Sequence, residues 1–168
     1  QWNGLAWTRI GGDAINSSWA NTTYENVLNM THFGGILYAG LGSSANDAEV
    51  WSYNGTTWTQ IGGDTLNSSW GAGYEGVYSL KNDGTNLYAG LGLTAGENEV
   101  WRWNGVAWSQ IGGDNLNSGF TNTHITVNSM AYGNGKLFAG LNSASGTLSA
   151  QVWEWNGTTW TRIGGDKV

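Results

Sequence analysis

The sequence contains no cysteine and carries little charge. Disulfides and thiol chemistry are therefore excluded, although the absence of cysteine does not fix the cellular compartment. Charged residues make up only 11% of the chain, against about a quarter in ordinary soluble domains. Glutamate and lysine, which favour helices, are scarce, and 28 glycines interrupt most helical windows. This composition favours short strands and tight turns.

Basic clusters and long apolar runs are also lacking. The net charge of -6 repels phosphate backbones, so nucleic acid is not expected as a partner. The longest plain apolar run, 36–41, is too short to span a bilayer, and we expect no membrane insertion. The chain begins at Gln1 rather than Met, which we interpret as a processed product, an excised fragment or a renumbered chain.

The sequence does contain an internal repeat with a period of about fifty residues. An aromatic-Asn-Gly motif begins at Trp2, Tyr53, Trp103 and Trp155. A second tryptophan follows each motif, at Trp7, Trp58, Trp108 and Trp160. An Ile-Gly-Gly-Asp motif then ends at Asp13, Asp64, Asp114 and Asp166. The repetition runs the length of the chain, which excludes chance as its explanation.

Each repeat carries about four strand signals, and the middle copy shows them clearly. Its apolar and aromatic segments are separated by turn residues and lie at 74–80, 87–91, 99–103 and 107–111. The pair Asn104-Gly105 lies between two aromatic runs and predicts a hairpin. A type I′ turn is expected there, with positive φ at both central positions.

Short strands repeated at this interval predict an all-β protein built from β-propeller blades. A single four-stranded blade cannot bury both of its faces, whereas blades stacked around an axis can. We expect one repeat domain over 1–168, in which 1–13 form a partial terminal repeat that duplicates a terminal hairpin. The three blades are expected at 14–64, 65–114 and 115–168.

The middle repeat resembles a kelch-type propeller blade. Kelch blades have a glycine or small-residue pair at the end of the second strand, followed by a Tyr and a Trp that flank a hairpin. Residues 87–92, followed by Trp103 and Trp108 on either side of a hairpin, are similar to that pattern. The paired glycines, however, fall after the fourth strand, at 112–113. The repeats also resemble lectin-type propellers of tachylectin-like organisation, which implies one sugar site per blade.

Three blades are fewer than the roughly four to eight that closed propellers contain. A wedge of three blades would expose two apolar faces, so self-association is expected. The favoured arrangement is a dimer in which two chains close a six-bladed ring. The alternatives are a piece of a longer propeller and head-to-tail growth into a filament through the duplicated terminal strand.

No arrangement for catalysis is visible, and we expect a protein that is not an enzyme. His32 and His124 occupy different places in their repeats, so neither belongs to a repeated nucleophile–base pair. The Asp after each Gly-Gly pair is interpreted as a turn residue rather than as a glycosidase carboxylate. Catalytic sites are usually asymmetric, whereas this chain keeps the same residues in every copy.

The acidic loop residues favour neither a metal site nor a cofactor. Glu49 and Glu99 share a position in the first two repeats, but the third repeat has Gln151 near it. A calcium site needs several converging oxygen ligands, and the third copy lacks these acids. We therefore interpret Glu49 and Glu99 as solvated residues at the start of a strand.

The tryptophans divide into two groups. One group alternates with small residues in strands and is interpreted as core between blades: Trp51, Trp58, Trp101 and Trp108. Trp19 and Trp70 lie instead in a polar Asn-Ser-Ser-Trp loop. There the ring can stack on the C–H face of a sugar while amide and hydroxyl groups bind its OH groups. The alternative is that these two rings fill the gap between blades.

The candidate carbohydrate-binding residues recur in equivalent loops. They are Asn16, Ser18, Trp19 and Tyr24 in the first repeat, and Asn67, Ser69, Trp70 and Tyr74 in the second. The third repeat has an altered site with Asn117, Phe120 and His124. These loops predict a secreted or cell-surface recognition module with multivalent binding of glycans. The alternative is a structural or assembly protein, such as a filament or appendage subunit or an engineered propeller fragment.

Overall fold

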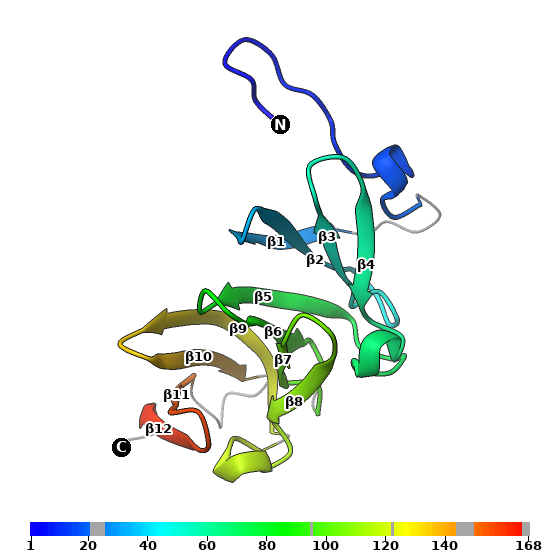
Figure 1. Cartoon of the computed structure of the whole chain (residues 1–168). Helices are drawn as coiled ribbons and strands as arrows, with labels where there is room; N and C mark the ends of the chain where they lie inside the picture. Colours follow the sequence, from blue (N-terminus) through cyan, green and yellow to red (C-terminus); the bar gives the residue numbers. More distant parts are fainter. Residues whose placement is uncertain (21–25, 95, 122, 144–149, 166–168) are drawn as a thin grey trace.

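The computed structural model describes residues 1–20, 26–94, 96–121, 123–143 and 150–165. Within these ranges the regular structure is antiparallel β-sheet with three short 3-10 turns, so the all-β prediction is confirmed. The strands form three four-stranded units that follow one another along the chain, and the N-terminal residues project beyond the first unit (Figure 1). Tyr24 lies outside the described residues.

The three units have the same order of elements. Unit 1 consists of β1 (Asn26–Phe33), β2 (Ile36–Gly42), β3 (Val50–Tyr53) and β4 (Trp58–Gly62). Unit 2 consists of β5 (Gly76–Asn82), β6 (Leu87–Gly92), β7 (Val100–Trp103) and β8 (Trp108–Gly112). Unit 3 consists of β9 (His124–Gly133), β10 (Lys136–Ser143), β11 (Gln151–Trp155) and β12 (Trp160–Gly164). The 3-10 turns precede the units and are η1 (Ile15–Ser17), η2 (Leu66–Ser68) and η3 (Leu116–Ser118). The strands of unit 2 overlap the segments predicted from the middle repeat.

Each unit is an antiparallel meander in which consecutive strands pair. Neighbouring units are joined by single residue pairs, Gly42 with Gly76 and Gly92 with Thr126. A side chain at Gly42 would collide with the backbone of Gly76, so glycine is needed where the units approach. The sheet is not closed among the described strands, and the Trp-rich, all-β arrangement is compatible with a propeller-like repeat fold.

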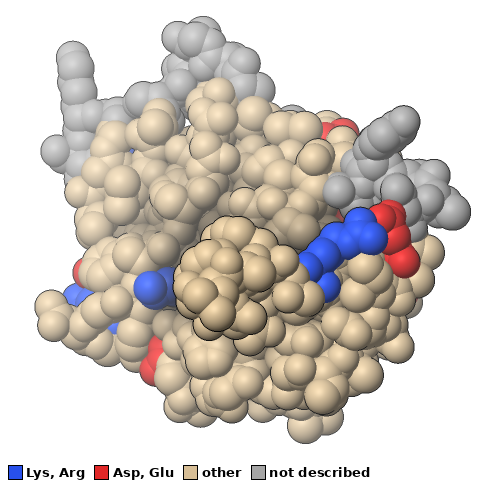
Figure 2. Space-filling model, turned by 90° about the horizontal axis from the view of Figure 1, so that it is seen from above, with Lys and Arg blue, Asp and Glu red and all other residues tan. Residues whose placement is uncertain are grey.

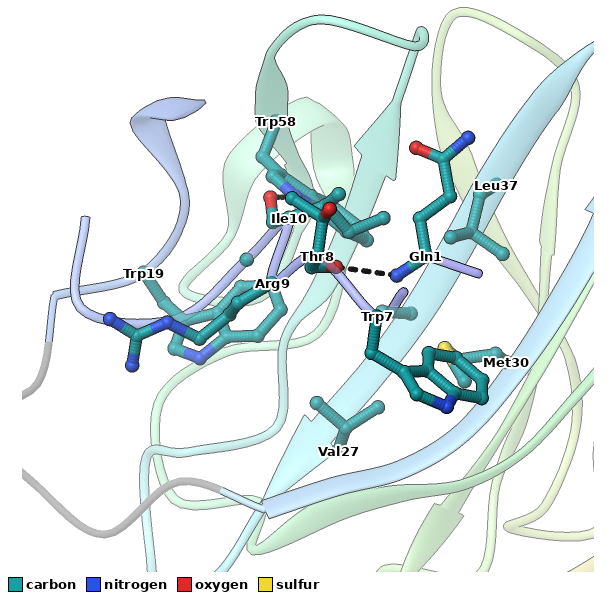
Figure 3. Close-up of a pocket in the computed structure, with 12 residues that line it drawn as sticks. Gln1, Trp7, Thr8, Arg9, Ile10, Trp19, Val27, Met30, Leu37 and Trp58 are labelled. Atoms are coloured by element: carbon teal, nitrogen blue, oxygen red, sulfur yellow. Dashed lines mark hydrogen bonds between the residues drawn. The ribbon is translucent and has the colours of Figure 1, made fainter. Parts of the chain in front are cut away.

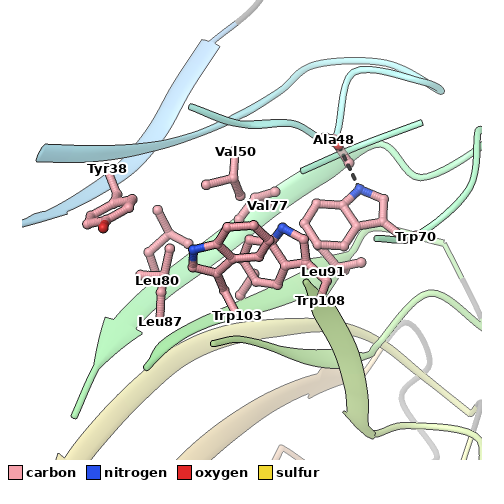
Figure 4. Packing of buried hydrophobic residues seen from close by; sticks show 11 residues of the cluster. Tyr38, Ala48, Val50, Trp70, Val77, Leu80, Leu87, Leu91, Trp103 and Trp108 are labelled. Atoms are coloured by element: carbon pink, nitrogen blue, oxygen red, sulfur yellow. Dashed lines mark hydrogen bonds between the residues drawn. The ribbon is translucent and has the colours of Figure 1, made fainter. Parts of the chain in front are cut away.

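Tryptophans fill the space between units. Trp108 of β8 is only 3% exposed, and its indole N–H donates to the carbonyl of Ile61 in unit 1 at 2.8 Å. The equivalent bond joins every unit to the segment before it. Figure 4 shows Trp108 with Trp103 and Trp70 among the aliphatic side chains of this cluster. The prediction that Trp58 and Trp108 belong to the core is confirmed, since both are buried.

The hairpin predicted at Asn104-Gly105 is present, but its turn is not type I′. Trp103 pairs directly with Trp108, which leaves a longer loop between the strands. Gly105 has a φ of 96°, whereas Asn104 does not have a positive φ. The Asn104 side chain instead accepts hydrogen bonds from the N–H groups of the two residues after Gly105, both at 2.9 Å. The turn is therefore held by an asparagine side chain.

The loop after each fourth strand has an unusual backbone. In the loop between units 1 and 2, Asp64 and Asn67 have φ values of 52° and 54°, and Thr65 and Ser68 have 66° and 61°. The same positions are left-handed in the other two loops, which confirms that the Asp after Gly-Gly is a turn residue at each described position. Asn and Asp tolerate this conformation, whereas it strains a β-branched residue such as Thr65.

Replacing Thr65 by asparagine is expected to raise the free energy of unfolding by about 1 kcal/mol, because asparagine tolerates a left-handed backbone better than threonine. Asn115 already occupies the equivalent position, with a φ of 61°. Urea unfolding of the purified protein measures the change. The reciprocal substitution, Asn115→Thr, should lower the free energy of unfolding by a similar amount, and unchanged midpoints for both variants would contradict this account.

Residues 1–10 form a small hairpin that projects beyond unit 1 (Figure 1) and contacts it through Ile10. Trp2 and Trp7 pair in a single bridge, and their ring centroids are 5.6 Å apart. Trp7 is 79% exposed, whereas the equivalent Trp58 is 5% exposed. The hairpin has the sequence of the third and fourth strands of a unit, but the described chain has no first and second strands beside it.

Candidate functional site

The polar residues predicted for the sugar site hold their loops in place. The Nδ2 atoms of Asn16, Asn67 and Asn117 donate to the carbonyls of Ile10, Ile61 and Ile111. Ser18 and Ser69 are buried, and their hydroxyl oxygens accept hydrogen bonds from the N–H groups of Gly12 and Gly63. All five side chains thus have partners within the protein.

The aromatic rings of these loops pack against the following unit. Trp70 is 2% exposed and Phe120 is 1% exposed, while Trp19 is half-buried. The Trp70 indole donates to the carbonyl of Ala48 at 2.7 Å and lies edge-on to Trp101, with a centroid distance of 5.8 Å. These contacts fit the gap-filling alternative, because a buried ring has no free face to offer a sugar.

A second set of tryptophans lies at the edge of the core. Trp51 and Trp101, interpreted from the sequence as core, are only half-buried, as is the equivalent Trp153. Each donates its indole N–H to the side chain two residues earlier: Glu49 at 2.6 Å, Glu99 at 2.6 Å and Gln151 at 2.9 Å. Every unit therefore presents a half-buried indole beside a fixed acceptor.

The acceptor residues are more deeply placed than the sequence suggested. Glu99 is 4% exposed and Gln151 is 6% exposed. The interpretation of Glu99 as a solvated residue is therefore wrong, because Tyr74 and Gly113 lie against its side chain. The only sequence signal for this arrangement is the repeated pattern of an acceptor, a valine and a tryptophan at the start of each third strand.

In unit 2 the predicted site residue Tyr74 completes the arrangement. Its hydroxyl donates to Oε1 of Glu99 at 2.9 Å. The pKa of Glu99 is raised to about 7, mainly by burial. The bonds from Trp101 and Tyr74 oppose this shift, and the charge of Asp114 adds to it. Burial and the neighbouring Glu99 raise the pKa of Tyr74, which therefore remains a donor. Burial likewise raises the pKa of Glu49 in unit 1.

Unit 3 has a cavity of about 480 Å³ at the equivalent place. It lies between the loop before unit 3 and the last two strands, and its lining includes His124, Gln151, Trp153 and Arg162. His124 replaces Tyr74 of unit 2 and is only 2% exposed. Neither imidazole nitrogen of His124 has a hydrogen-bond partner among the described residues. The structure thus brings together the predicted site residues Phe120 and His124 with Trp153 and Arg162, which the sequence did not single out. The sequence singled out Gln151 only as the counterpart of Glu49 and Glu99.

The residues of this cavity can bind a small polar molecule without covalent chemistry. The half-buried Trp153 supplies an aromatic surface, while Gln151, His124 and Arg162 supply hydrogen-bonding groups around it. Among the described residues, no group of three or more His, Cys, Asp or Glu side chains is placed to hold a metal ion. No helix in the described part of the chain is long and apolar enough to cross a membrane.

No family model matches the chain, and no curated protein matches it either. The resemblance to kelch-type and lectin-type propellers therefore has no support from relatives and depends on the repeated residues alone.

Proposed function

We propose that this protein is a multivalent carbohydrate-binding protein that acts outside the cell or at its surface and is not an enzyme. The observation that carries the proposal is the cavity of unit 3, which places an unpartnered, buried imidazole beside a half-buried indole. We infer that the three units are β-propeller blades and that each carries an equivalent site.

The chemistry of the cavity suits a sugar. A neutral imidazole has one donor and one acceptor, and a sugar hydroxyl can satisfy either of them. His124 is 2% exposed, so a hydroxyl group would reach its nitrogens by displacing the loop before unit 3. The new bond would remove the cost of about 1–3 kcal/mol that an unpaired buried polar group carries. The apolar C–H face of the same sugar would stack on Trp153, whose N–H is already held by Gln151.

The three sites are equivalent in position but not in strength. In unit 2 the hydroxyl of Tyr74 binds the acceptor Glu99, so a ligand competes with a protein group. In unit 3 His124 makes no such bond, and we expect the strongest binding there. Several weak sites on one particle gain avidity when glycans are presented together on a surface.

Replacing His124 by leucine is expected to weaken glycan binding at unit 3 and to stabilise the protein. The affinity of that site should fall at least about tenfold, the loss that corresponds to about 1.4 kcal/mol. The free energy of unfolding should rise by about 1–3 kcal/mol, because a buried unpaired polar group is removed. A glycan array identifies the ligand, and titration calorimetry and urea unfolding measure the two effects.

A variant that binds glycan more weakly but unfolds less readily has lost binding without losing its fold. His32→Leu is the matched control, because His32 is exposed and lies in unit 1, outside the cavity of unit 3. The substitution should change neither glycan binding at unit 3 nor the free energy of unfolding by much. A protein that binds no glycan on the array, or a His124→Leu variant that binds as tightly as the original, would overturn the proposal.

A further inference from the structure

The contact between neighbouring units is built from a valine on one unit and a glycine on the other. A Cβ atom placed on Gly40 of unit 1 would lie 2.8 Å from Cγ1 of Val77 in unit 2. Similarly, a Cβ atom on Gly90 of unit 2 would lie 2.7 Å from Cγ1 of Val127 in unit 3. Both valines are fully buried. The glycine, which has no side chain, therefore leaves the space that the valine of the next unit fills.

A side chain two residues after each valine position fixes this contact by a hydrogen bond. Asn29 of unit 1 donates to the carbonyl of Val77 at 2.6 Å, and Ser79 of unit 2 donates to the carbonyl of Val127 at 2.8 Å. The interface between units 1 and 2 thus has the same steric and polar pattern as the interface between units 2 and 3.

The outer faces of unit 1 and unit 3 carry the residues of this interface but have no neighbouring unit to pack against. On unit 1, Val27 is 44% exposed and Met30 is 61% exposed. On unit 3, Gly140 and the exposed Ser129 line a cavity of about 220 Å³. Ile163 is 48% exposed, whereas the equivalent Ile111 is 5% exposed. At the unit 1 end, Val27 has no glycine of a preceding unit to pack against. At the unit 3 end, Gly140 has no valine of a following unit beside it.

A groove separates the N-terminal hairpin from the exposed face of unit 1. Two adjoining cavities of about 400 Å³ and 590 Å³ occupy it, and both are lined by Trp7, Met30 and Leu37. Figure 3 shows Trp7 over Met30 and Val27, with Leu37 on the strand behind them. Seen from this end, the molecular surface is almost uncharged, with only scattered Lys, Arg, Asp and Glu side chains (Figure 2). The groove lies where the first two strands of a further unit would stack.

We propose that the exposed face of unit 1 binds unit 3 of a second copy of this chain, head to tail. Val27 would lie against Gly140 of the second copy, and Ser129 of that copy would donate to the carbonyl of Val27. This contact continues the two internal interfaces with the same residue types at the same repeat positions. Each copy retains a free end, so two copies can close the six-bladed ring and further copies can extend it.

The second copy would take the place of the N-terminal hairpin. Residues 2–13 match 155–166 except at Leu5 and Ala6, which are both threonine in the later segment. At present the Trp58 indole donates to the carbonyl of Ile10, and in the assembly it would donate to the equivalent Ile163. Trp2 and Trp7 of the hairpin are exposed, so displacing the hairpin costs mainly the packing and the hydrogen bond at Ile10, which Ile163 would replace.

One position requires the new junction to differ from the internal ones. Asn142 stands where Gly42 and Gly92 allow the backbones of neighbouring units to pair. The junction would therefore form through the packing of Val27 on Gly140 and the hydrogen bond from Trp58 to Ile163. It would lack the backbone pair that Gly42 and Gly92 make at the internal interfaces. This leaves apolar burial, worth about 25 cal/mol per Å², as its main source of stability.

Sedimentation velocity of the full chain over a range of concentrations tests the proposal. The original protein should sediment as two or more copies, and Val27→Asp should reduce it to a single chain. The matched control is Val106→Asp, because Val106 is 76% exposed at the tip of the β7–β8 hairpin, away from both end faces. The control should sediment like the original protein.

Mixing two damaged variants tests the head-to-tail direction. Ser129→Asp should damage the opposite face and also give single chains. A mixture of Val27→Asp and Ser129→Asp should restore a two-chain particle, because each variant supplies the face that the other lacks. A monomeric original protein, an oligomer that survives Val27→Asp, or a mixture that remains monomeric would each overturn the proposal.

Discussion

Replacing Trp108 by alanine is expected to lower the free energy of unfolding by about 3–5 kcal/mol, a large share of the stability of a domain of this size. The ring is 3% exposed and packs on Trp70 at a centroid distance of 5.2 Å. Alanine would leave a cavity between units 1 and 2 and would remove the donor to the Ile61 carbonyl. Both losses fall at the same interface between units.

Trp7→Ala is the matched control for this prediction, because Trp7 has the same repeat position but is 79% exposed. Its effect should stay within about 0.5 kcal/mol, as is usual for surface substitutions. Urea unfolding followed by tryptophan fluorescence and circular dichroism measures both variants. Equal losses at the two positions would show that packing between units is not what stabilises the described structure.

The sequence predicts where the strands lie but not which tryptophans pack between units. Strand positions were predictable because turn residues such as Asn104 recur at fixed places and act locally. Trp101 and Trp108 could not be told apart, since both alternate with small residues on neighbouring strands. The structure separates them by their hydrogen-bond partners: Trp108 donates to the Ile61 carbonyl of unit 1, whereas Trp101 donates to Glu99 of its own unit.

The candidate site was less predictable than the strands for the same reason. The sequence places Phe120 and His124 in the loop before unit 3, but it does not show that His124 lacks a partner. Nor does it show that Gln151 and Trp153 of β11 line the same cavity as His124. Likewise, the sequence does not show that Glu99 is buried, because Tyr74 and Gly113, which contact it, come from the loops before units 2 and 3.

Glu99→Gln is expected to remove most of a pH dependence of stability between about pH 4.5 and pH 7. The folded pKa of Glu99 is about 7, above its ordinary value of 4.5, so the folded state holds the proton more tightly than the unfolded state. Its stabilising contribution is therefore complete below about pH 4.5 and is lost as the pH rises through 7. At about 1.4 kcal/mol per pKa unit, the loss is about 3 kcal/mol.

At about pH 8 the glutamine variant should therefore be more stable than the original protein, by up to about 3 kcal/mol. Near pH 4.5 the two proteins should be about equal. Glutamine fits because Gln151 already accepts the Trp153 indole at 2.9 Å in unit 3. The reciprocal change, Gln151→Glu, buries a second carboxylate and should steepen the loss of stability with rising pH. Urea midpoints at both pH values measure these effects, and a Glu99→Gln variant that keeps the original pH dependence would show that Glu99 is not its source.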